Sequence, residues 1–296
     1  MAHRAGFVSI LGLPNAGKST LLNALLGRRL SGVSPKPQTT RHRLLGILNT
    51  QDEQAVFVDT PGWLTKTSDK LQESLKRESQ RAAREDCDLA LLVADPFPPS
   101  PEDTAALAKL APRGVRLWFV LNKVDLASAP EKLEPALAAW TEALKPERTF
   151  QVSALKGAGV GGLKDAVLKA LPESPAYYDK DQLSDRWDRF FATEIIREQI
   201  FALYSAEVPH ACAVVIEDYK ETPRRDLVHA LIHVERDSQK GILIGKQGDA
   251  LRELTERSQA ALESFTGRKA HLELWVKVWK DWRKDERALK EFGYLD

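Results

Sequence analysis

The chain has 296 residues, more than one hydrophobic core usually organises, so we expect two domains. Hydrophobic residues make up 43% and charged residues 29%, a composition that excludes a disordered or fibrous chain. The net charge of +1 does not indicate whether the chain binds nucleic acid. A nucleic-acid partner would therefore need a local basic patch or a shaped groove.

Only Cys87 and Cys212 are present, which excludes a disulfide framework and indicates a reducing compartment. We expect no secretory signal, and no apolar run approaches the roughly 20 residues that span a bilayer. The expected location is therefore the cytoplasm, and we do not expect an oligomer. Peripheral contact with the inner face of the cell membrane stays open, although no sequence feature supports it.

A phosphate-binding loop is the first motif along the chain. Residues 7–11 form an apolar run, a helical run follows, and the segment between them fits the pattern G-x-x-x-x-G-K-[ST]. Gly12 and Gly17 let the backbone curl so that N–H groups face phosphate oxygens, and Lys18 adds a positive charge. Ser19 offers a hydroxyl to Mg²⁺. The loop residues expected to contact nucleotide are Gly12, Asn15, Ala16, Gly17, Lys18, Ser19 and Thr20.

A long connection over residues 27–37 follows, rich in glycine, serine and proline, and loops of this length are often functional. It leads to Thr39 and Thr40, just before an expected strand over residues 44–48. A threonine in this place reaches Mg²⁺ and the terminal phosphate in GTPases with switch loops. The sequence does not separate Thr39 from Thr40, and a β-branched polar pair that caps a strand is the competing interpretation. We assign the role to Thr40.

The next strand, residues 55–58, ends at Asp59, which is followed by Thr60, Pro61 and Gly62. An aspartate at a strand tip beside a phosphate-binding loop can hold Mg²⁺, directly or through water. Gly62 can offer its backbone N–H to the terminal phosphate. A second switch is expected over residues 64–86, as a loop followed by a solvated helix.

Two buried strands over residues 89–94 and 115–121 lead to Asn122, Lys123 and Asp125. The Asp125 carboxylate can accept both the ring N–H and the exocyclic amine of guanine, a donor pair that adenine lacks. Asn122 would tie this loop to the phosphate loop, while the Lys123 stem lies along the base. The backbone of Ser153, Ala154 and Leu155, after the next strand, would meet the guanine carbonyl.

These elements occur in the order seen in Ras-like GTPases, and residues 1–171 resemble the small GTPases of the TrmE-Era-EngA group. The resemblance implies a doubly wound α/β sheet and hydrolysis of GTP to GDP and phosphate. It assigns the catalytic roles to Lys18, Thr40 and Gly62, and the Mg²⁺ ligands to Ser19, Thr40 and Asp59. The residues expected to bind GTP outside the phosphate loop are Asp59, Gly62, Asn122, Lys123, Asp125, Ser153, Ala154 and Leu155.

Two positions bear on the mechanism. Trp63 stands where Ras-like enzymes carry a water-orienting glutamine, and an indole cannot polarise water, so hydrolysis is slow or is completed by another group. Asn15 resembles the residue with which some relatives coordinate K⁺ beside the phosphates. K⁺ is therefore a further expected cofactor.

A second domain begins after a proline-containing linker, so we place the GTPase domain at 1–172, the linker at 173–180 and the second domain at 181–296. We expect a helix over 187–204, ended by Val208-Pro209, and then strands over 211–217 and 227–234. An apolar segment at 241–244, a helix to about residue 265 and a strand over 270–278 should follow. This order is typical of a smaller α+β KH domain of type II.

The Gly-Lys-Gln-Gly turn at residues 245–248 matches the loop with which KH domains clamp about four nucleotides of single-stranded RNA. Alone, such a turn more often joins two helices without binding anything. The order of the surrounding elements favours KH. The predicted RNA contacts are Ile242, Ile244, Gly245, Lys246, Gln247, Gly248 and Leu251, with Arg268, Lys269 and Lys277 from a basic cluster that acidic residues dilute.

A GTPase joined to one KH domain resembles the Era family over essentially the whole chain. The family implies a GTPase switch that binds 16S ribosomal RNA near its 3′ end and assists maturation of the 30S subunit. The alternative is a P-loop GTPase whose second domain docks to membrane or protein. A nucleotide kinase is disfavoured because Asn122 to Asp125 would have no role there.

Overall fold

The computed structural model describes residues 3–34, 36, 39–63, 67–84, 87–112, 114–127 and 129–295. It divides into two compact units. The first comprises residues 1–31, 40–67 and 75–185, and the second comprises residues 32–39, 68–74 and 186–296. Each unit is described by itself.

The first unit is built on a six-stranded sheet in the order β2-β3-β1-β4-β5-β6. β2 runs antiparallel to β3, and the other pairs are parallel. The switch in strand order beside β1 defines a doubly wound sheet, as predicted. The strands are β1 (Arg4–Gly12), β2 (Leu44–Asn49), β3 (Glu53–Asp59), β4 (Leu89–Ala94), β5 (Arg116–Leu121) and β6 (Arg148–Gln151).

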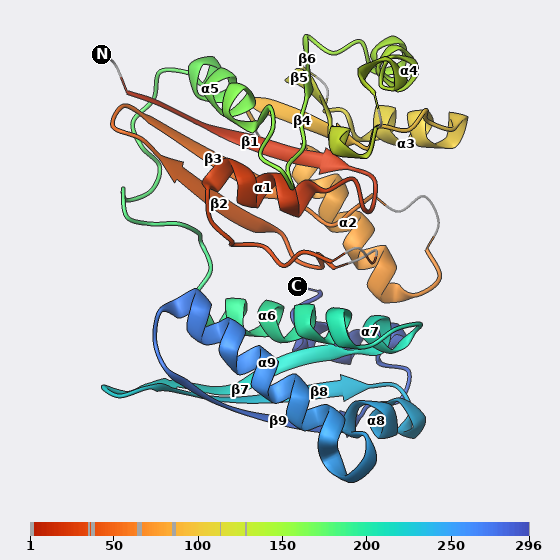
Figure 1. The fold of residues 1–296 in the computed structure, drawn as a ribbon, viewed down its shortest axis with the longest axis vertical. Helices are drawn as coiled ribbons and strands as arrows, with labels where there is room; N and C mark the ends of the chain where they lie inside the picture. The colour runs from red at the N-terminus through yellow and green to blue at the C-terminus, as the bar shows by residue number, and fades with distance from the viewer. Residues whose placement is uncertain are drawn as a thin grey trace. The chain divides into compact units, whose positions relative to one another are not determined.

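Helices cover this sheet, with α1 and α5 side by side over one face and α3 and α4 over the other (Figure 1). All residues of β4 are buried because both faces of the strand are covered, which explains its continuous apolar sequence. The helices are α1 (Lys18–Leu26), α2 (Lys70–Arg84), α3 (Pro101–Leu110), α4 (Glu134–Leu144) and α5 (Val160–Ala170), with short 3₁₀ turns η1 (Val124–Leu126) and η2 (Pro130–Lys132).

Residues 173–185, after α5, belong to the first unit and run along its sheet. Gln54 donates to the Tyr178 carbonyl at 2.8 Å, and Ser184 Oγ donates to the Leu45 carbonyl at 2.6 Å. The division into compact units therefore falls after Asp185. The domain limits given from the sequence stay predictions.

The second unit has a three-stranded sheet in the order β7-β8-β9. β7 and β8 are antiparallel, while β8 and β9 are parallel. The chain order helix-strand-strand-helix-helix-strand confirms the predicted type II KH fold. The elements are α6 (Asp188–Leu203), α7 (Val208–Ala211), β7 (Ala213–Glu221), β8 (Asp226–Val234), α8 (Asp237–Ile244), η3 (Lys246–Gly248), α9 (Asp249–Thr266), β9 (Ala270–Val278), η4 (Trp282–Lys284) and α10 (Glu286–Glu291).

One hydrophobic core lies between this sheet and the helices α6 and α9. Along β9, alternate residues from Ala270 to Val276 are buried and those between them are exposed, the period of two expected of a strand with one covered face. Two details differ from the sequence prediction. Val208 and Pro209 open the short helix α7, whose first turn accommodates a proline, and residues 241–244 form the last turn of α8.

Residues 32–39 are part of the second unit and contact its helix α6. Arg197, only 2% exposed, donates to the Thr39 carbonyl at 2.9 Å and pairs with Glu194. The backbone N–H of Val33 donates to the buried Glu198 carboxylate at 3.1 Å. Buried charge-assisted bonds of this kind hold a backbone segment firmly, because breaking one leaves an uncompensated charge.

No helix among the described residues is both long enough and apolar enough to cross a membrane.

We predict that Leu254→Ala loosens the KH core. The side chain is fully buried in α9, so its removal should lower the free energy of opening by about 2–5 kcal/mol. Native-state hydrogen exchange of the β8 amides in the intact chain measures this change. Glu256→Ala, on an exposed position of the same helix, is the control, and equal exchange in the two variants would contradict the predicted packing.

Candidate functional site

The phosphate loop joins the end of β1 to the start of α1, and its glycines are required by close packing. A Cβ on Gly12 would lie 2.3 Å from the Val93 carbonyl oxygen. A Cβ on Gly17, whose φ is 89°, would lie 2.3 Å from the Asn122 amide nitrogen. The backbone at both positions therefore admits only glycine.

Lys18 is buried at the first position of α1. Its ammonium group donates to the Leu13 carbonyl at 2.9 Å and to the Gly12 carbonyl at 3.3 Å. Burial lowers the pKa of Lys18 to about 8, a change that the nearby Asp59 carboxylate partly offsets and Lys123 reinforces. A phosphate beside this ammonium group would favour its charged form.

Three oxygen-bearing side chains meet beside Lys18. Ser19 Oγ donates to Asp59 Oδ2 at 2.7 Å and lies 2.8 Å from Thr40 Oγ1. The Thr39 hydroxyl instead donates to the Lys36 carbonyl, so it is Thr40 that lies at the site. Ser31 adds a bond to Asp59 Oδ2 at 3.2 Å.

Asp59 is fully buried, and its second oxygen, Oδ1, has no hydrogen-bond partner among the described residues. Burial raises the pKa of the Asp59 carboxyl, while Lys18 and the hydroxyls of Ser19 and Ser31 oppose that rise. An orphaned carboxylate oxygen beside two hydroxyls is the oxygen-rich donor set that Mg²⁺ takes. The residues present therefore fit this metal ion.

Gly62 and Trp63 follow β3 and pack directly on the phosphate loop. A Cβ on Gly62 would lie 2.7 Å from the Pro14 Cα, and the Trp63 N–H donates to the Gly12 carbonyl at 3.2 Å. The Trp63 side chain, 6% exposed, packs into the core cluster under α3 and α4. Trp63 therefore contacts the phosphate loop through its backbone N–H, while its indole is part of the core.

Asn122 connects three loops at the carboxyl end of the sheet. Its amide nitrogen donates to the Ala16 carbonyl at 3.0 Å, and its amide oxygen accepts the Ala154 N–H at 3.0 Å. Lys123 donates to the Asn15 carbonyl, and Ser153 Oγ donates to the Asp125 carboxylate. The base-recognition loop and the phosphate loop are thus fixed relative to each other.

The predicted nucleotide residues of the first unit lie at the carboxyl ends of its strands, where open α/β sheets bind ligands. These residues are Gly12, Asn15, Ala16, Gly17, Lys18, Ser19, Thr20, Thr40, Asp59, Gly62, Asn122, Lys123, Asp125, Ser153, Ala154 and Leu155. Ser31 was not predicted, since it lies in an irregular loop and no spacing rule marks it. Nor was Arg197, whose contact with Thr39 joins positions 158 residues apart.

The Gly-Lys-Gln-Gly turn joins α8 to α9 in the second unit (Figure 1). Gly245 has a φ of 72°, and a Cβ there would lie 2.6 Å from the Ala250 Cβ. Gly248, with a φ of 83°, precedes the first residue of α9. The turn therefore requires both glycines and presents the side chains between them at the helix start.

The other predicted RNA residues are placed differently from one another. Ile242 is half exposed, whereas Ile244 and Leu251 pack partly into the core. Arg268 pairs with the buried Asp226 at 2.8 Å. The remaining two are Lys269, which pairs with Glu263 at 3.1 Å, and Lys277, which is exposed on the face of β9 turned away from the core.

Comparisons with known proteins agree with this geometry. Residues 7–123 match the family model described as 50S ribosome-binding GTPase, and residues 207–283 match the KH domain. The chain is 42% identical to the GTPase Era of Syntrophus aciditrophicus, an alignment that covers 98% of this chain and 95% of that protein. The chain belongs to the Era family of GTPases. It is therefore an enzyme that hydrolyses GTP.

Other Era proteins extend the similarity. The chloroplastic GTPase ERA1 of Zea mays is 40% identical over 99% of this chain and 71% of its own length. A crystal structure of an Aquifex aeolicus Era variant bound to GDP and AlF₄⁻ is 35% identical and superposes with a TM-score of 0.94, covering 99% of this chain and all of that one. An Era complex with MgGDPNP and nucleotides 1506–1542 of 16S ribosomal RNA is 36% identical, with the same TM-score and coverage.

We predict that GDP binding to this Era-family chain takes up protons at pH 8. The Lys18 pKa of about 8 leaves roughly half of the ammonium groups neutral there, and a bound phosphate would restore their charge. Calorimetry without Mg²⁺, in two buffers of different ionisation enthalpy, should give a larger proton uptake at pH 8 than at pH 7, where most Lys18 side chains are already charged. Equal uptake at the two pH values would contradict this assignment of Lys18.

Proposed function

We propose that the chain is a Mg²⁺-dependent GTPase switch that binds single-stranded RNA near the 3′ end of small-subunit ribosomal RNA and assists maturation of the 30S subunit. The observation that carries the nucleotide assignment is Asn122, whose two bonds join the phosphate loop to the base-recognition loop. The RNA assignment is supported by the KH fold and by the relative bound to a 16S fragment.

In the hydrolytic site, Ser19, Thr40 and Asp59 would hold Mg²⁺, which when bound neutralises phosphate charge. Lys18 adds a second positive charge, and the Gly62 N–H would donate to the terminal phosphate. Trp63 gives no group that orients water, so the intrinsic rate is slow.

We predict that Asp125→Asn shifts preference from guanine toward xanthine. Asparagine donates where aspartate accepts, and xanthine presents an oxygen where guanine presents an amine. Competition binding with GDP and XDP should show that the affinity for GDP falls more than tenfold. The control is Asp95→Asn, which makes the same change from carboxylate to amide outside the loop of residues 122–125. Unchanged selectivity would remove Asp125 from the base site.

K⁺ is proposed as a second cation, held with the help of Asn15. Asn15 has a φ of 63°, and its carbonyl accepts a bond from Lys123, so its backbone is fixed at the outer turn of the phosphate loop. GTP turnover should be several-fold faster in K⁺ than in Na⁺ buffer, and Asn15→Ala should remove the difference. Equal wild-type rates in the two buffers would exclude this role.

RNA binding is proposed to depend on the turn between α8 and α9. Phosphates that approach the turn closely need its glycines, and Lys246 between them supplies charge. The half-exposed Ile242 offers an apolar surface beside the turn on which unpaired bases can lie.

We predict that Lys246→Asp combined with Gly248→Asp abolishes binding of a single-stranded 16S 3′-end oligonucleotide, while GTP binding persists. Lys246→Asp alone, which keeps both glycines, should weaken RNA binding at least tenfold. Lys220→Asp, an equal charge change on an exposed residue of β7, should not. Fluorescence anisotropy measures all three variants.

The alternative is that the second unit docks to protein or to the inner face of the cell membrane. It predicts that the Lys246 variants bind RNA as the wild type does and that the intact chain sediments with vesicles of anionic phospholipid. Crosslinking and sequencing of co-purified RNA separates the two accounts, because only the first predicts enrichment of the small-subunit 3′ end.

We also propose that nucleotide and RNA binding are coupled through the segment before Thr40. Arg197 and Glu198 of the KH helix α6 hold the Thr39 carbonyl and the Val33 N–H. Thr39 is covalently joined to Thr40, whose hydroxyl contacts Ser19. A change in Thr40 when the terminal phosphate is lost would therefore pull on the segment that α6 binds, an order-disorder switch of the kind seen in GTPases.

A further inference from the structure

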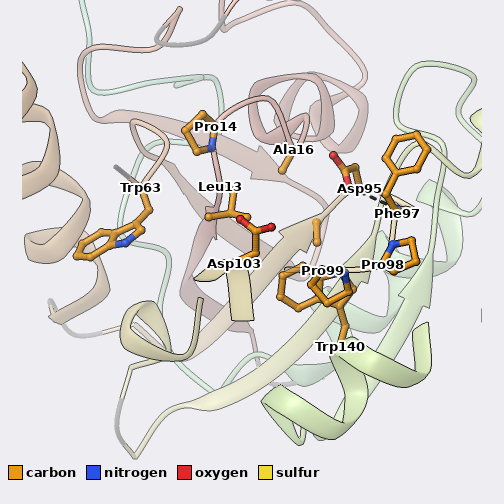
Figure 2. Close-up of a pocket in the computed structure, with 11 residues that line it drawn as sticks. Leu13, Pro14, Ala16, Trp63, Asp95, Phe97, Pro98, Pro99, Asp103 and Trp140 are labelled. Carbon is orange, nitrogen blue, oxygen red and sulfur yellow. Dashed lines mark hydrogen bonds between the residues drawn. The ribbon is translucent and has the colours of Figure 1, made fainter. Parts of the chain in front are cut away.

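A cavity of about 480 Å³ lies in the first unit on the side of the phosphate loop lined by Pro14 and Trp63 (Figure 2). Figure 2 shows these two residues at one side of it and Phe97 with Pro98 at the other. Trp140 of α4 lines it as well. The lining includes none of Ser19, Thr40, Asp59 or Asp125, so the cavity is separate from the expected metal and base sites.

The lining of the cavity is acidic. Among the described residues, its lining carries two carboxylates, Asp95 after β4 and Asp103 in the first turn of α3, and no lysine, arginine or histidine. The Lys76 ammonium of α2 lies over the Trp63 ring, 5.3 Å from its centroid, which shows that this ring accepts a cation on its face. The rest of the wall is largely aromatic or proline, and Phe97 is 56% exposed. Such a surface selects a cation that also has apolar faces. The guanidinium group meets both requirements, since it is weakly hydrated, stacks on aromatic rings and pairs with carboxylates.

The hydrogen-bonding groups of the lining leave room for a ligand. Asp103 uses Oδ2 for the capping box with Ser100, and Asp95 accepts a long bond of 3.4 Å from the Phe97 N–H through Oδ1. Trp140 is 2% exposed, and its indole N–H has no partner in the part of the chain that the structure describes. A buried donor without an acceptor is costly. That N–H is shielded from solvent, so recognition of a ligand falls to the two carboxylates.

The position of the cavity connects it to hydrolysis. Pro14 packs against Gly62, and the Trp63 N–H is bonded to the Gly12 carbonyl. A group that fills the cavity therefore touches the phosphate loop and the residue that replaces the water-orienting glutamine. By restraining Pro14 and Trp63, it would also restrain Gly62, which precedes Trp63 and packs on Pro14.

We propose that this cavity binds an arginine side chain of a partner protein, and that its binding accelerates GTP hydrolysis by restraining Pro14 and Trp63. The two carboxylates recognise the guanidinium group, and the aromatic and proline walls pack on its faces. Lysine fits less well, because its ammonium is a compact, strongly hydrated charge that does not stack. The proposal rests on the GTPase activity and is independent of the RNA role.

The test uses the intact chain with N-acetyl-arginine N-methylamide, and the matched lysine amide as control, each to tens of millimolar. With ¹⁵N-labelled tryptophan, the indole N–H signals of Trp63 and Trp140, assigned by Trp→Phe variants, should shift with the arginine amide. GTP turnover should rise about two- to tenfold at saturation. The lysine amide should do neither.

Asp95→Asn should weaken binding of the arginine amide several-fold, and Asp95→Asn with Asp103→Asn at least tenfold. If the double variant is unstable, the single variant still tests the proposal, because it leaves Asp103 and therefore the capping box of α3 intact. Glu102→Gln, which removes an exposed carboxylate from the same turn of α3 without lining the cavity, should change neither binding nor turnover.

Three results would overturn the proposal: no indole shift with the arginine amide, an equal response to the lysine amide, or binding that leaves turnover unchanged. Absence of GTP turnover in the wild-type chain without any amide would instead overturn the GTPase account. The two failures are therefore distinguishable.

Discussion

The nucleotide site depends on burying two opposite charges, Lys18 at the start of α1 and Asp59 at the end of β3. Burial disfavours both charged forms, as the lowered pKa of Lys18 and the raised pKa of Asp59 show. The mutual attraction of the two groups and the hydroxyls around them offset only part of this cost. A phosphate at Lys18 and a divalent cation at Asp59 would stabilise both charges. The folded chain therefore gains stability when it binds its ligand.

The rest of the first unit fixes the position of Lys18 and Asp59 relative to the base-recognition loop. Parallel pairing of β1 with β3 and β4 brings the phosphate loop and Asp59 to the same edge of the sheet. Asn122, nearly fully buried, then fixes the distance from that edge to Asp125. In the second unit, the glycines of the Gly-Lys-Gln-Gly turn, which have positive φ, have a similar role, since they expose backbone and Lys246 where a phosphate chain can approach.

Much of this could be predicted from the sequence, because the signals are local. The buried strand β4 is a continuous apolar run, the strand β9 alternates from Ala270 to Val276, and the motifs at Gly12, Asp59 and Asn122 each lie at or just after the end of a strand. Contacts between distant irregular segments could not be predicted. The hydrogen bonds from Ser31 to Asp59 and from Arg197 to the Thr39 carbonyl depend on how the loops fold back. The periodicity of the sequence does not record this. Two adjacent threonines are equivalent in pattern, so the sequence alone provided no physical reason for assigning the role to Thr40; in the structure the Thr40 hydroxyl lies beside Ser19 and the Thr39 hydroxyl does not.

The central claim is that the state of the nucleotide reaches the KH domain through the segment that ends at Thr40. The direct measurement is the affinity of the intact chain for a 16S 3′-end oligonucleotide with GDP and with a non-hydrolysable GTP analogue. We expect affinities that differ at least fivefold, a difference of the size usual for coupled sites. The difference should shrink in Arg197→Gln and persist in Arg189→Gln, an arginine of the same helix that binds backbone carbonyls of β7. Equal wild-type affinities in the two nucleotide states would contradict the account.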